Sequence, residues 1–222
     1  MSLSRIYPAS DLPDPVLIER YGKLASPLVS DVFNRWSGNG LLPIAGVQPG
    51  QVVVGPALTC RTRPGDNLAV HKALDLARPG EILVVDARGA EDRAILGGLM
   101  GAYATKQGIA GLIVDGAVRD RTDLEKKAPP VWARTLNQLG PYKDGPGDIR
   151  CPVNIDGVVV AEGDIIVADE DGITVVPRDR AEEILELAEA KAADEAGQFA
   201  DIERGEWDRS WIDPALQPEI VE

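Results

Sequence analysis

The segment ILGGLMGAYATKQGIAGLIVDGAVRDRTDL, residues 95–124, holds the groups best suited to chemistry in this sequence. Gly97 and Gly98 stand where a helix is expected to begin, and Gly101 removes another side chain from its first turn. Free N–H groups at the start of a helix, unshielded by side chains, form a ready site for an anion. Glycines here can equally serve close packing of a helix on a strand, so this piece alone leaves both interpretations open.

Arg119 and Asp120 follow directly after a predicted strand that ends in Asp115 and Gly116. In α/β sheets, ligands bind beyond the carboxyl ends of the strands. Arg119 is a fixed cation that can hold a carboxylate or an enolate oxygen with two donors. Asp120 offers hard oxygen ligands that suit Mg²⁺ or Mn²⁺. The alternative interpretation is an ordinary solvated turn that carries two opposite charges.

Helices and strands alternate in the part of the chain that must position these residues. The strands are continuous apolar runs, which is typical of a partly parallel sheet with both faces covered. The expected order is a helix over 67–77, a strand over 81–87, a helix over 94–107, a strand over 110–116, a short helix over 119–126 and a strand over 129–134. Asp66 is expected to cap the first of these helices.

The N-terminal part is expected to begin with an extended arm over residues 1–15, which prolines punctuate. Two short helices follow in the prediction, over 15–24 and 27–36, the second with Ser26 as its N-cap. Prolines and glycines predict a loop over 41–50.

Beyond the alternating segment the pattern changes. Residues 51–63, which precede it, predict a strand pair or a bent strand, and the strand-rich stretch 151–177 predicts a β-meander. A charged amphipathic helix is expected from Arg178 to about residue 200. The tail 201–222 is expected to pack on a neighbouring subunit, because it carries apolar residues, Trp207 among them, between charges. We therefore predict one α/β domain, 1–222, with a β-rich second layer.

Composition narrows the class of protein. The 222 residues carry 36 acidic and 23 basic side chains, a net charge of −13, which argues against general binding of nucleic acid. No apolar run is long enough to span a membrane, and the start of the chain lacks the pattern of a signal peptide, so we expect a cytoplasmic protein with Cys60 and Cys151 as reduced thiols. The single histidine, His71, is expected to be structural and half-exposed. One imidazole excludes sites that need several, so oxygen ligands must hold any metal.

The pattern of a glycine, twenty intervening residues (99–118) and then Arg119-Asp120, within the stretch DGAVRD, resembles the 4-hydroxy-4-methyl-2-oxoglutarate aldolase and regulator of ribonuclease activity A family. The resemblance continues through PGDNLAVHKALDLARPGEILVVDARG (64–89) and GDIIVADEDGITVVP (163–177), and covers roughly residues 20–195. It implies a swivelling β/β/α-type fold, assembled as homotrimers or homohexamers with active sites between subunits.

The same resemblance implies roles for individual residues. Asp120 would coordinate Mg²⁺ or Mn²⁺, and Arg119 would contact the keto or enolate oxygen of a small 2-oxo acid. The pyruvyl carboxylate would be held by the substrate-binding turn, which comprises Gly98, Leu99, Met100 and Gly101. Metal and arginine would then lie where negative charge develops when a C–C bond beside a ketone breaks.

The sequence departs from the family pattern at two places. Many of the aldolases carry an acidic residue at the position of Gly98, where it helps to hold metal-bound water. The His-Glu pair of the aldolases that degrade aromatic compounds is matched here by Ser30 and Asp31. Asp31 could still act as the acid/base, supplied from an adjacent subunit.

These observations lead to one functional hypothesis and one rival. The first is a divalent-metal-dependent lyase, a class II pyruvate aldolase, that cleaves a 4-hydroxy-2-oxo acid to release pyruvate or decarboxylates oxaloacetate through a pyruvate enolate. The rival is a non-catalytic regulatory protein that binds an RNA-processing enzyme. A weaker option is hydration or tautomerisation of a related acid at the same site. Dependence on metal and on Asp120 would separate the lyase from the regulator.

Overall fold

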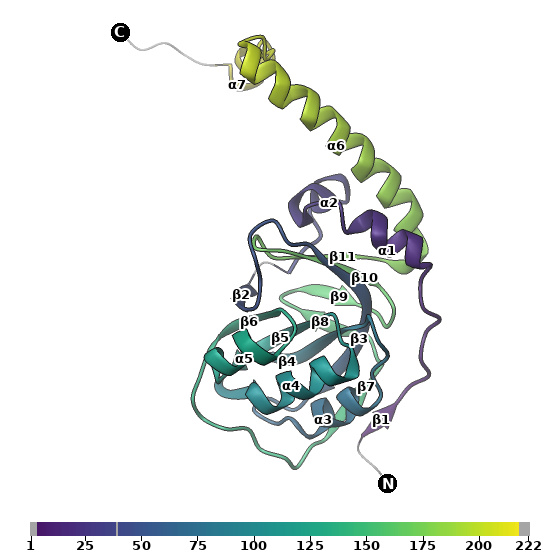
Figure 1. The fold of residues 1–222 in the computed structure, drawn as a ribbon, viewed down its shortest axis with the longest axis vertical. Helices are drawn as coiled ribbons and strands as arrows, with labels where there is room; N and C mark the ends of the chain where they lie inside the picture. Colours follow the sequence, from purple (N-terminus) through teal and green to yellow (C-terminus); the bar gives the residue numbers. More distant parts are fainter. Residues whose placement is uncertain (1–3, 39, 218–222) are drawn as a thin grey trace.

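A mixed sheet forms the centre of the protein in the computed structural model, which describes residues 4–38 and 40–217 (Figure 1). Its four parallel strands are β3 (Val53–Thr62), β4 (Ile82–Leu96), β5 (Gly111–Val118) and β6 (Val131–Leu136). At one edge β2 (Leu42–Ala45) runs antiparallel to β6. At the other, β7 (Gly147–Ile149) runs antiparallel to β3, and β1 (Arg5–Ile6) pairs with β7.

The parallel strands are buried on both faces, as their continuous apolar sequences predict. One face packs against α3 (Leu68–Asp75), α4 (Gly98–Gln107) and α5 (Arg121–Lys127). The predicted alternation of helix and strand is therefore confirmed. All eight residues of β5 are buried, so this strand lies in the middle of the core and presents its carboxyl end to the site.

A second β layer covers the other face of the sheet. It consists of two hairpins, one of β8 (Val153–Ile155) with β9 (Val158–Val160) and one of β10 (Ile165–Ala168) with β11 (Ile173–Val176). Trp132, Ile82 and Ile113 of the sheet pack against this layer. The prediction of a β-rich second layer is confirmed, but the single meander is wrong, because β10 pairs with the first half of β3 rather than with β9.

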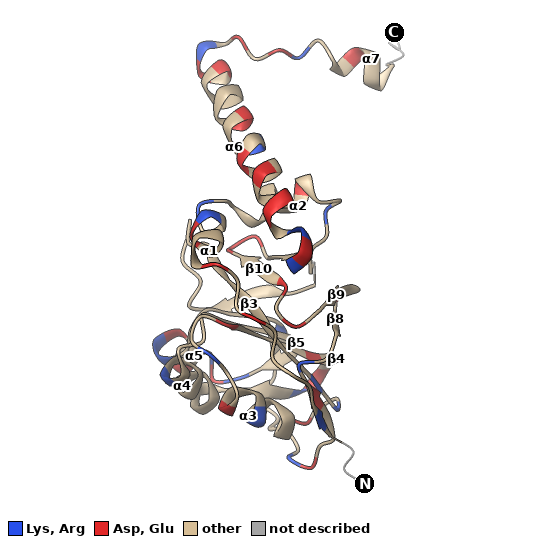
Figure 2. Ribbon diagram, turned by 90° about the vertical axis from the view of Figure 1, so that its right-hand side faces the viewer, with Lys and Arg blue, Asp and Glu red and all other residues tan. Residues whose placement is uncertain are grey.

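Helices from the two ends of the chain pack on the outer side of the β10–β11 hairpin. They are α1 (Pro15–Tyr21), α2 (Ser26–Val32) and the start of α6 (Ala181–Arg204). The rest of α6 leads away from the body to α7 (Ile212–Leu216), and acidic residues occur along its length (Figure 2). The predicted terminal helices are confirmed. Among the described residues, no helix combines the length and the apolar character that crossing a membrane requires.

Three local predictions need correction. The expected loop over 41–50 contains β2, an edge strand, where Pro43 is tolerated because an edge strand needs fewer ladder hydrogen bonds. Ser26 is not the N-cap of α2, because its hydroxyl donates instead to Asp169 Oδ1 at 2.6 Å. The helix expected from residue 94 begins only at Gly98, since β4 continues through irregular pairing with β5 as far as Leu96.

Candidate active site

A cavity of about 220 Å³ lies where β4 and β5 end, beside the start of α4. The residues that line it come from four separate parts of the chain. From the predicted site the structure places Leu99, Met100, Arg119 and Asp120 around it, with Gly97 beside them. Gly98 and Gly101 do not line the cavity, and a Cβ at Gly101 would lie 2.6 Å from Ala128 Cβ, so this glycine serves packing. It adds Asn67 and His71 from the region of α3, and Gly140, Pro141 and Lys143 from the loop after β6.

The start of α4 is open because two consecutive glycines leave it bare. A Cβ at Gly97 would lie 2.6 Å from Asp120 Oδ2, and a Cβ at Gly98 would lie 2.6 Å from Asp123 Cβ. Both positions therefore exclude a side chain unless a neighbour moves. Leu99 and Met100 follow as the next residues of the helix, and their N–H groups are among the four that lack partners within it. The turn can offer these donors to a carboxylate, as the sequence predicts.

Asp120 adopts a left-handed backbone conformation, with φ of +61°, immediately before α5. Aspartate tolerates this conformation better than most residues. The turn directs its carboxylate back toward α4, where Oδ2 accepts a hydrogen bond of 3.1 Å from the Gly98 N–H. The side chain remains 45% exposed, so its other oxygen electron pairs stay accessible to a metal or a substrate.

Arg119 lies beside Asp120 with weak polar contacts. Its Nε is 3.8 Å from Asp120 Oδ2, and its Nη1 donates to the Gln138 carbonyl at 3.4 Å. Gly140 makes room for the guanidinium, because a Cβ there would lie 3.0 Å from Nη1. The arginine is held in the cavity wall while most of its donors remain available for a ligand.

Asp123 does not pair with Arg119, although the helical spacing allows such an ion pair. Its Oδ1 accepts a 2.7 Å contact from Lys127 Nζ instead. Its Oδ2 lies 3.2 Å from where a Cβ of Gly98 would be, so the carboxyl group occupies the space beside that glycine. Lys127 lowers the pKa of Asp123, which keeps this exposed carboxyl ionised.

The carboxylates of Asp120 and Asp123 thus flank the Gly97-Gly98 turn. Protein sites for Mg²⁺ commonly use one or two carboxylates and leave several waters on the ion. Of the two aspartates, only Asp120 lines the cavity, and its carboxylate fits a hydrated Mg²⁺ or Mn²⁺. It does not fit a metal that needs a dense protein cage, since the described residues contain no cluster of three or more His, Cys, Asp or Glu side chains placed to hold an ion.

Three polar side chains of the cavity carry no predicted ligand role: Asn67, His71 and Lys143. Lys143 Nζ lies 3.2 Å from Asn67 Oδ1 and 3.2 Å from His71 Nε2. His71 is half-buried, as expected, but it lines the cavity, and burial followed by the charge of Lys143 lowers its pKa. Asn67 and His71 lie in the stretch GDNLAVHKAL, part of the family resemblance, so the sequence could have indicated them. Lys143 lies in no motif and could not be found from the sequence.

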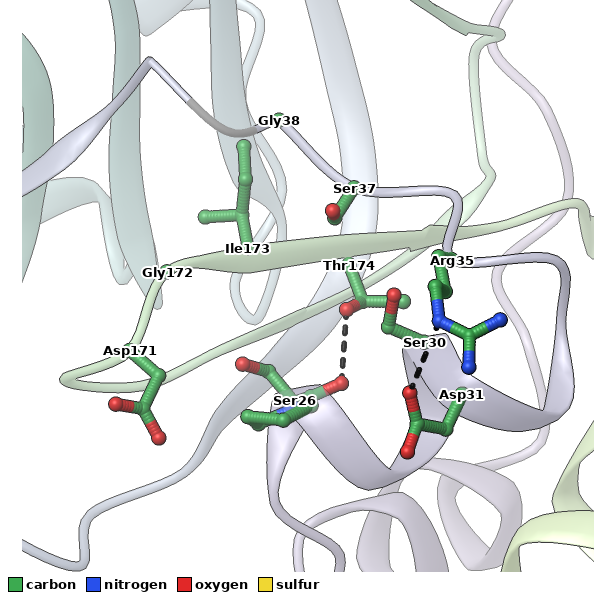
Figure 3. Close-up of a pocket in the computed structure, with 11 residues that line it drawn as sticks. Ser26, Ser30, Asp31, Arg35, Ser37, Gly38, Asp171, Gly172, Ile173 and Thr174 are labelled. Carbon is green, nitrogen blue, oxygen red and sulfur yellow. Dashed lines mark hydrogen bonds and ion pairs between the residues drawn. The ribbon is translucent and has the colours of Figure 1, made fainter. Parts of the chain in front are cut away.

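Asp31 lies elsewhere on this chain, in a pocket formed with Ser30 and Arg35 and the β10–β11 hairpin (Figure 3). Its carboxylate is 3.7 Å from Arg35 Nε and 3.7 Å from Lys191 Nζ. The chain therefore does not bring its own Asp31 to its own cavity at Arg119. The role of Asp31 as an acid/base for an adjacent subunit stays a prediction.

Asp115, Asp86 and the two cysteines lie outside this cavity. Asp115 pairs with Arg134, which also contacts Asp156 at 2.9 Å, and burial raises the pKa of Asp115. Asp86 accepts from the N–H of Arg88 at 2.9 Å, as a turn former does. Both cysteines are buried free thiols, as predicted, and burial raises their pKa values.

Comparison with known proteins supports the resemblance. A putative 4-hydroxy-4-methyl-2-oxoglutarate aldolase of Halalkalibacterium halodurans is 40% identical over 178 residues, which is 80% of this chain and 84% of that protein. A 4-hydroxy-4-methyl-2-oxoglutarate aldolase of Thermus thermophilus is 36% identical over 112 residues, 50% of this chain and 68% of that protein.

A solved structure shares the same fold. The chain matches Streptomyces coelicolor RraAS2, described as an unusual member of the RNase ES inhibitor RraA protein family, with a TM-score of 0.74 and 28% identity over 88% of this chain and 98% of that one. The family model described as RraA-like, Aldolase/RraA, matches residues 26–175. The chain therefore belongs to the RraA-like family.

Proposed function

We propose that this protein is a divalent-metal-dependent lyase that cleaves a 4-hydroxy-2-oxo acid to release pyruvate and decarboxylates oxaloacetate. One observation carries the proposal: the open start of α4, the guanidinium of Arg119 and the carboxylate of Asp120 surround a single cavity. Together they offer amide donors for a carboxylate, a cation for an enolate oxygen and a hard ligand for a metal. The names of the relatives from H. halodurans and T. thermophilus support the same reaction class.

The residues of the chain can bind and orient a 2-oxo acid as follows. The N–H groups of Leu99 and Met100 hold the carboxylate next to the ketone. Arg119 donates to the ketone oxygen and stabilises the negative charge that grows there as the C–C bond breaks. Asp120 would hold Mg²⁺ or Mn²⁺. The bound ion supplies further positive charge for the enolate.

Proton transfer distinguishes the two reactions. Cleavage of a 4-hydroxy-2-oxo acid requires a base for the hydroxyl proton, for which we propose Asp31 of an adjacent subunit. Decarboxylation of oxaloacetate has no such proton to remove and is the less demanding activity for this site. Leu99 supports an interface here, since an apolar side chain 91% exposed at the cavity is suited to a neighbouring protomer. A homotrimer or homohexamer is the assembly that we expect.

Pyruvate release tests the proposal. Oxaloacetate and 4-hydroxy-4-methyl-2-oxoglutarate are each assayed with Mg²⁺, with Mn²⁺ and with EDTA, against the rate of the free ion. We expect turnover that EDTA and Asp120→Ala abolish, and that Asp194→Ala leaves intact. Asp194 is the matched control because it is an exposed aspartate on α6, away from the cavity.

The absence of turnover above the metal background on both acids would overturn the lyase. It would favour the regulatory role suggested by the names of RNA-processing inhibitors among the solved relatives, including a Thermus protein that matches with a TM-score of 0.62 and 30% identity over 68% of this chain and 92% of that one.

A further inference from the structure

A second cavity, of about 430 Å³, lies at the carboxyl end of β3. We call it the arginine pocket, because the charged side chains that line it are Arg61, Arg63, Arg88 and Asp148. Among the described residues, it shares no lining residue with the cavity at Arg119. Ligands of α/β sheets bind beyond the carboxyl ends of strands, so the position of the pocket suits a binding site of its own.

Asp148 is the one acidic side chain that lines the arginine pocket in the described part of the chain, and two arginines already use it. Its Oδ2 accepts from Arg5 Nη2 at 2.9 Å and from Arg61 Nη2 at 2.8 Å. The hydrogen bond from Arg5, supported by the one from Arg61, lowers the pKa of Asp148 to about 2, although burial opposes the shift. The carboxylate is therefore ionised at neutral pH, and the two arginines share its single charge.

Arg63 and Arg88 have no close carboxylate. Arg63 Nη2 lies 3.9 Å from Asp66 Oδ2 and 4.0 Å from Asp144 Oδ2, at the limit of an ion pair. The same oxygen of Asp66 already accepts from the N–H groups of Asp144 at 2.7 Å and Gly145 at 2.9 Å. Within residues 4–38 and 40–217, the guanidinium of Arg88 makes no hydrogen bond or ion pair with the protein. Both arginines therefore keep donors for a ligand.

The backbone of Arg88 indicates that its side chain serves binding and not folding. Its φ is +57°, a left-handed conformation that a long side chain adopts less readily than glycine or asparagine does. Asp86 holds the turn, because its Oδ1 accepts from the Arg88 N–H at 2.9 Å. Neither the turn nor this hydrogen bond requires an arginine. Residues in unfavourable backbone conformations cluster at ligand sites, which suits the position of Arg88 in the pocket wall.

We infer that the arginine pocket binds the phosphate group of a small phosphate monoester. Three guanidiniums against one carboxylate leave two surplus positive charges on its wall, in a chain whose net charge is −13. A phosphate monoester carries about −1.5 to −2 charges at pH 7 and offers three acceptor oxygens, which match the forked donors of arginine. A carboxylate would leave one positive charge unbalanced. A long polyanion such as nucleic acid would be repelled by the rest of the chain.

The size of the arginine pocket favours an ester over the free phosphate ion. Its volume of about 430 Å³ lies within the roughly 300–1,000 Å³ of common ligand pockets, which leaves room for an organic group beside the phosphate. The inference goes beyond the proposed lyase and depends on none of its residues, since Arg119 and Asp120 do not line this pocket. Either proposal can therefore fail without the other.

Phenyl phosphate and phenyl sulfate test the inference, because they have nearly the same shape and differ in charge. At about pH 7.5 the phosphate ester carries close to two negative charges and the sulfate ester carries one. Their affinities are measured by calorimetry for the native protein, Arg63→Met and Arg88→Met. Arg121→Met is the matched control, since this exposed arginine does not line the pocket. Arg119→Met tests for binding in the other cavity.

We expect the native protein to bind one phenyl phosphate per chain and to prefer it to phenyl sulfate by about tenfold. Arg63→Met and Arg88→Met should each weaken the binding of phenyl phosphate by roughly tenfold to a hundredfold, as the loss of a charge-assisted contact implies. Arg119→Met and Arg121→Met should retain the native affinity. At about pH 5 the native protein should bind phenyl phosphate more weakly, because the ester then carries a proton.

Several results would overturn the inference. They are the absence of phenyl phosphate binding, equal affinities for the two esters, and an affinity that survives both Arg63→Met and Arg88→Met. A loss confined to Arg119→Met would assign the ester to the lyase cavity and would overturn it as well. Inorganic phosphate separates the two sources of the phosphate group: weaker binding than that of phenyl phosphate supports an ester, and equal binding would replace the ester by the free ion.

Discussion

Two arginines near the end of the central sheet differ in how their charges are satisfied. Arg134, on β6, pairs with both Asp115 and Asp156 and is 22% exposed. Arg119, just after β5, has its nearest carboxylate at 3.8 Å and is 42% exposed. The charge of the first arginine is balanced by two carboxylates of the protein, whereas the second has no close carboxylate and keeps donors for a ligand. An arginine of the first kind stabilises structure, and one of the second kind is suited to bind a ligand.

The ion pairs of Arg134 and the site at Arg119 both involve strand β5. Asp115 lies within β5, opposite Asp86 in the register of β4, and Arg119 follows the end of the same strand. A few residues along one chain therefore separate a buried ion-pair network from an open site. Position beyond the strand end, and not residue type, distinguishes them. Substitutions that remove each charge should have opposite consequences for activity and stability.

The largest effect is expected on catalysis, from Arg119→Met. Loss of the cation beside the developing enolate should lower kcat for pyruvate release by about 100-fold to 1,000-fold. The free energy of unfolding should change by less than about 0.5 kcal/mol, because the side chain is exposed and weakly bonded. Arg121→Met is the matched control, since that arginine is exposed, pairs with Glu125 four residues along α5 and does not line the cavity. Comparable kcat values for the two variants would contradict the open-site interpretation.

The next effect is expected on stability, from Arg134→Met. It leaves Asp115 buried without its partner, which should lower the free energy of unfolding by about 3 kcal/mol. Urea unfolding measures the change, and kcat per folded molecule should stay near the native value. Adding Asp115→Asn to Arg134→Met should recover part of the loss, since the uncompensated charge is gone. A double variant no more stable than the single one would show that packing, not charge, is responsible.

A smaller effect concerns the pH dependence of that loss. Burial already raises the pKa of Asp115, and Arg134 opposes the rise, so Arg134→Met should raise this pKa further. A carboxyl whose folded pKa exceeds its unfolded value stabilises the fold while protonated and loses that contribution as the pH rises through the folded pKa. The deficit of Arg134→Met should therefore be smaller at about pH 5 than at about pH 7.5. A deficit that grows on acidification would reverse the assigned sign.

Local patterns predicted most of the fold, and long-range pairing accounts for what they missed. Buried parallel strands are continuous apolar runs, so β4 and β5 could be placed from sequence. The edge strand β2 could not, because Pro43 and the glycines around it favour a loop. The partner of β10 could not be predicted either, since β3 lies far away in the sequence and pairing with it is a tertiary contact.

The site divides in the same way. Gly98, Arg119 and Asp120 belong to one continuous strand–turn–helix segment, and their spacing made them predictable. Lys143 comes from an irregular loop whose position depends on hydrogen bonds to the turn before α3. Neither periodicity nor a motif in the sequence predicts these hydrogen bonds between the loop and Asp66. Asp123 could be noticed from helical spacing, but its actual partner, Lys127, depends on which rotamers the packing beside Gly98 allows.

The smallest effect is expected on the pKa of His71, the only histidine of the chain, which lines the cavity near Arg119. Burial, and then the charge of Lys143, lowers the pKa of His71, so Lys143→Met should raise it toward its ordinary value. One imidazole gives one set of ring signals, so an NMR titration reports the change without assignment. A His71 pKa that Lys143→Met does not move would mean that the charge of this lysine is already neutralised, as that of Arg134 is, and the two regions would then not differ in kind.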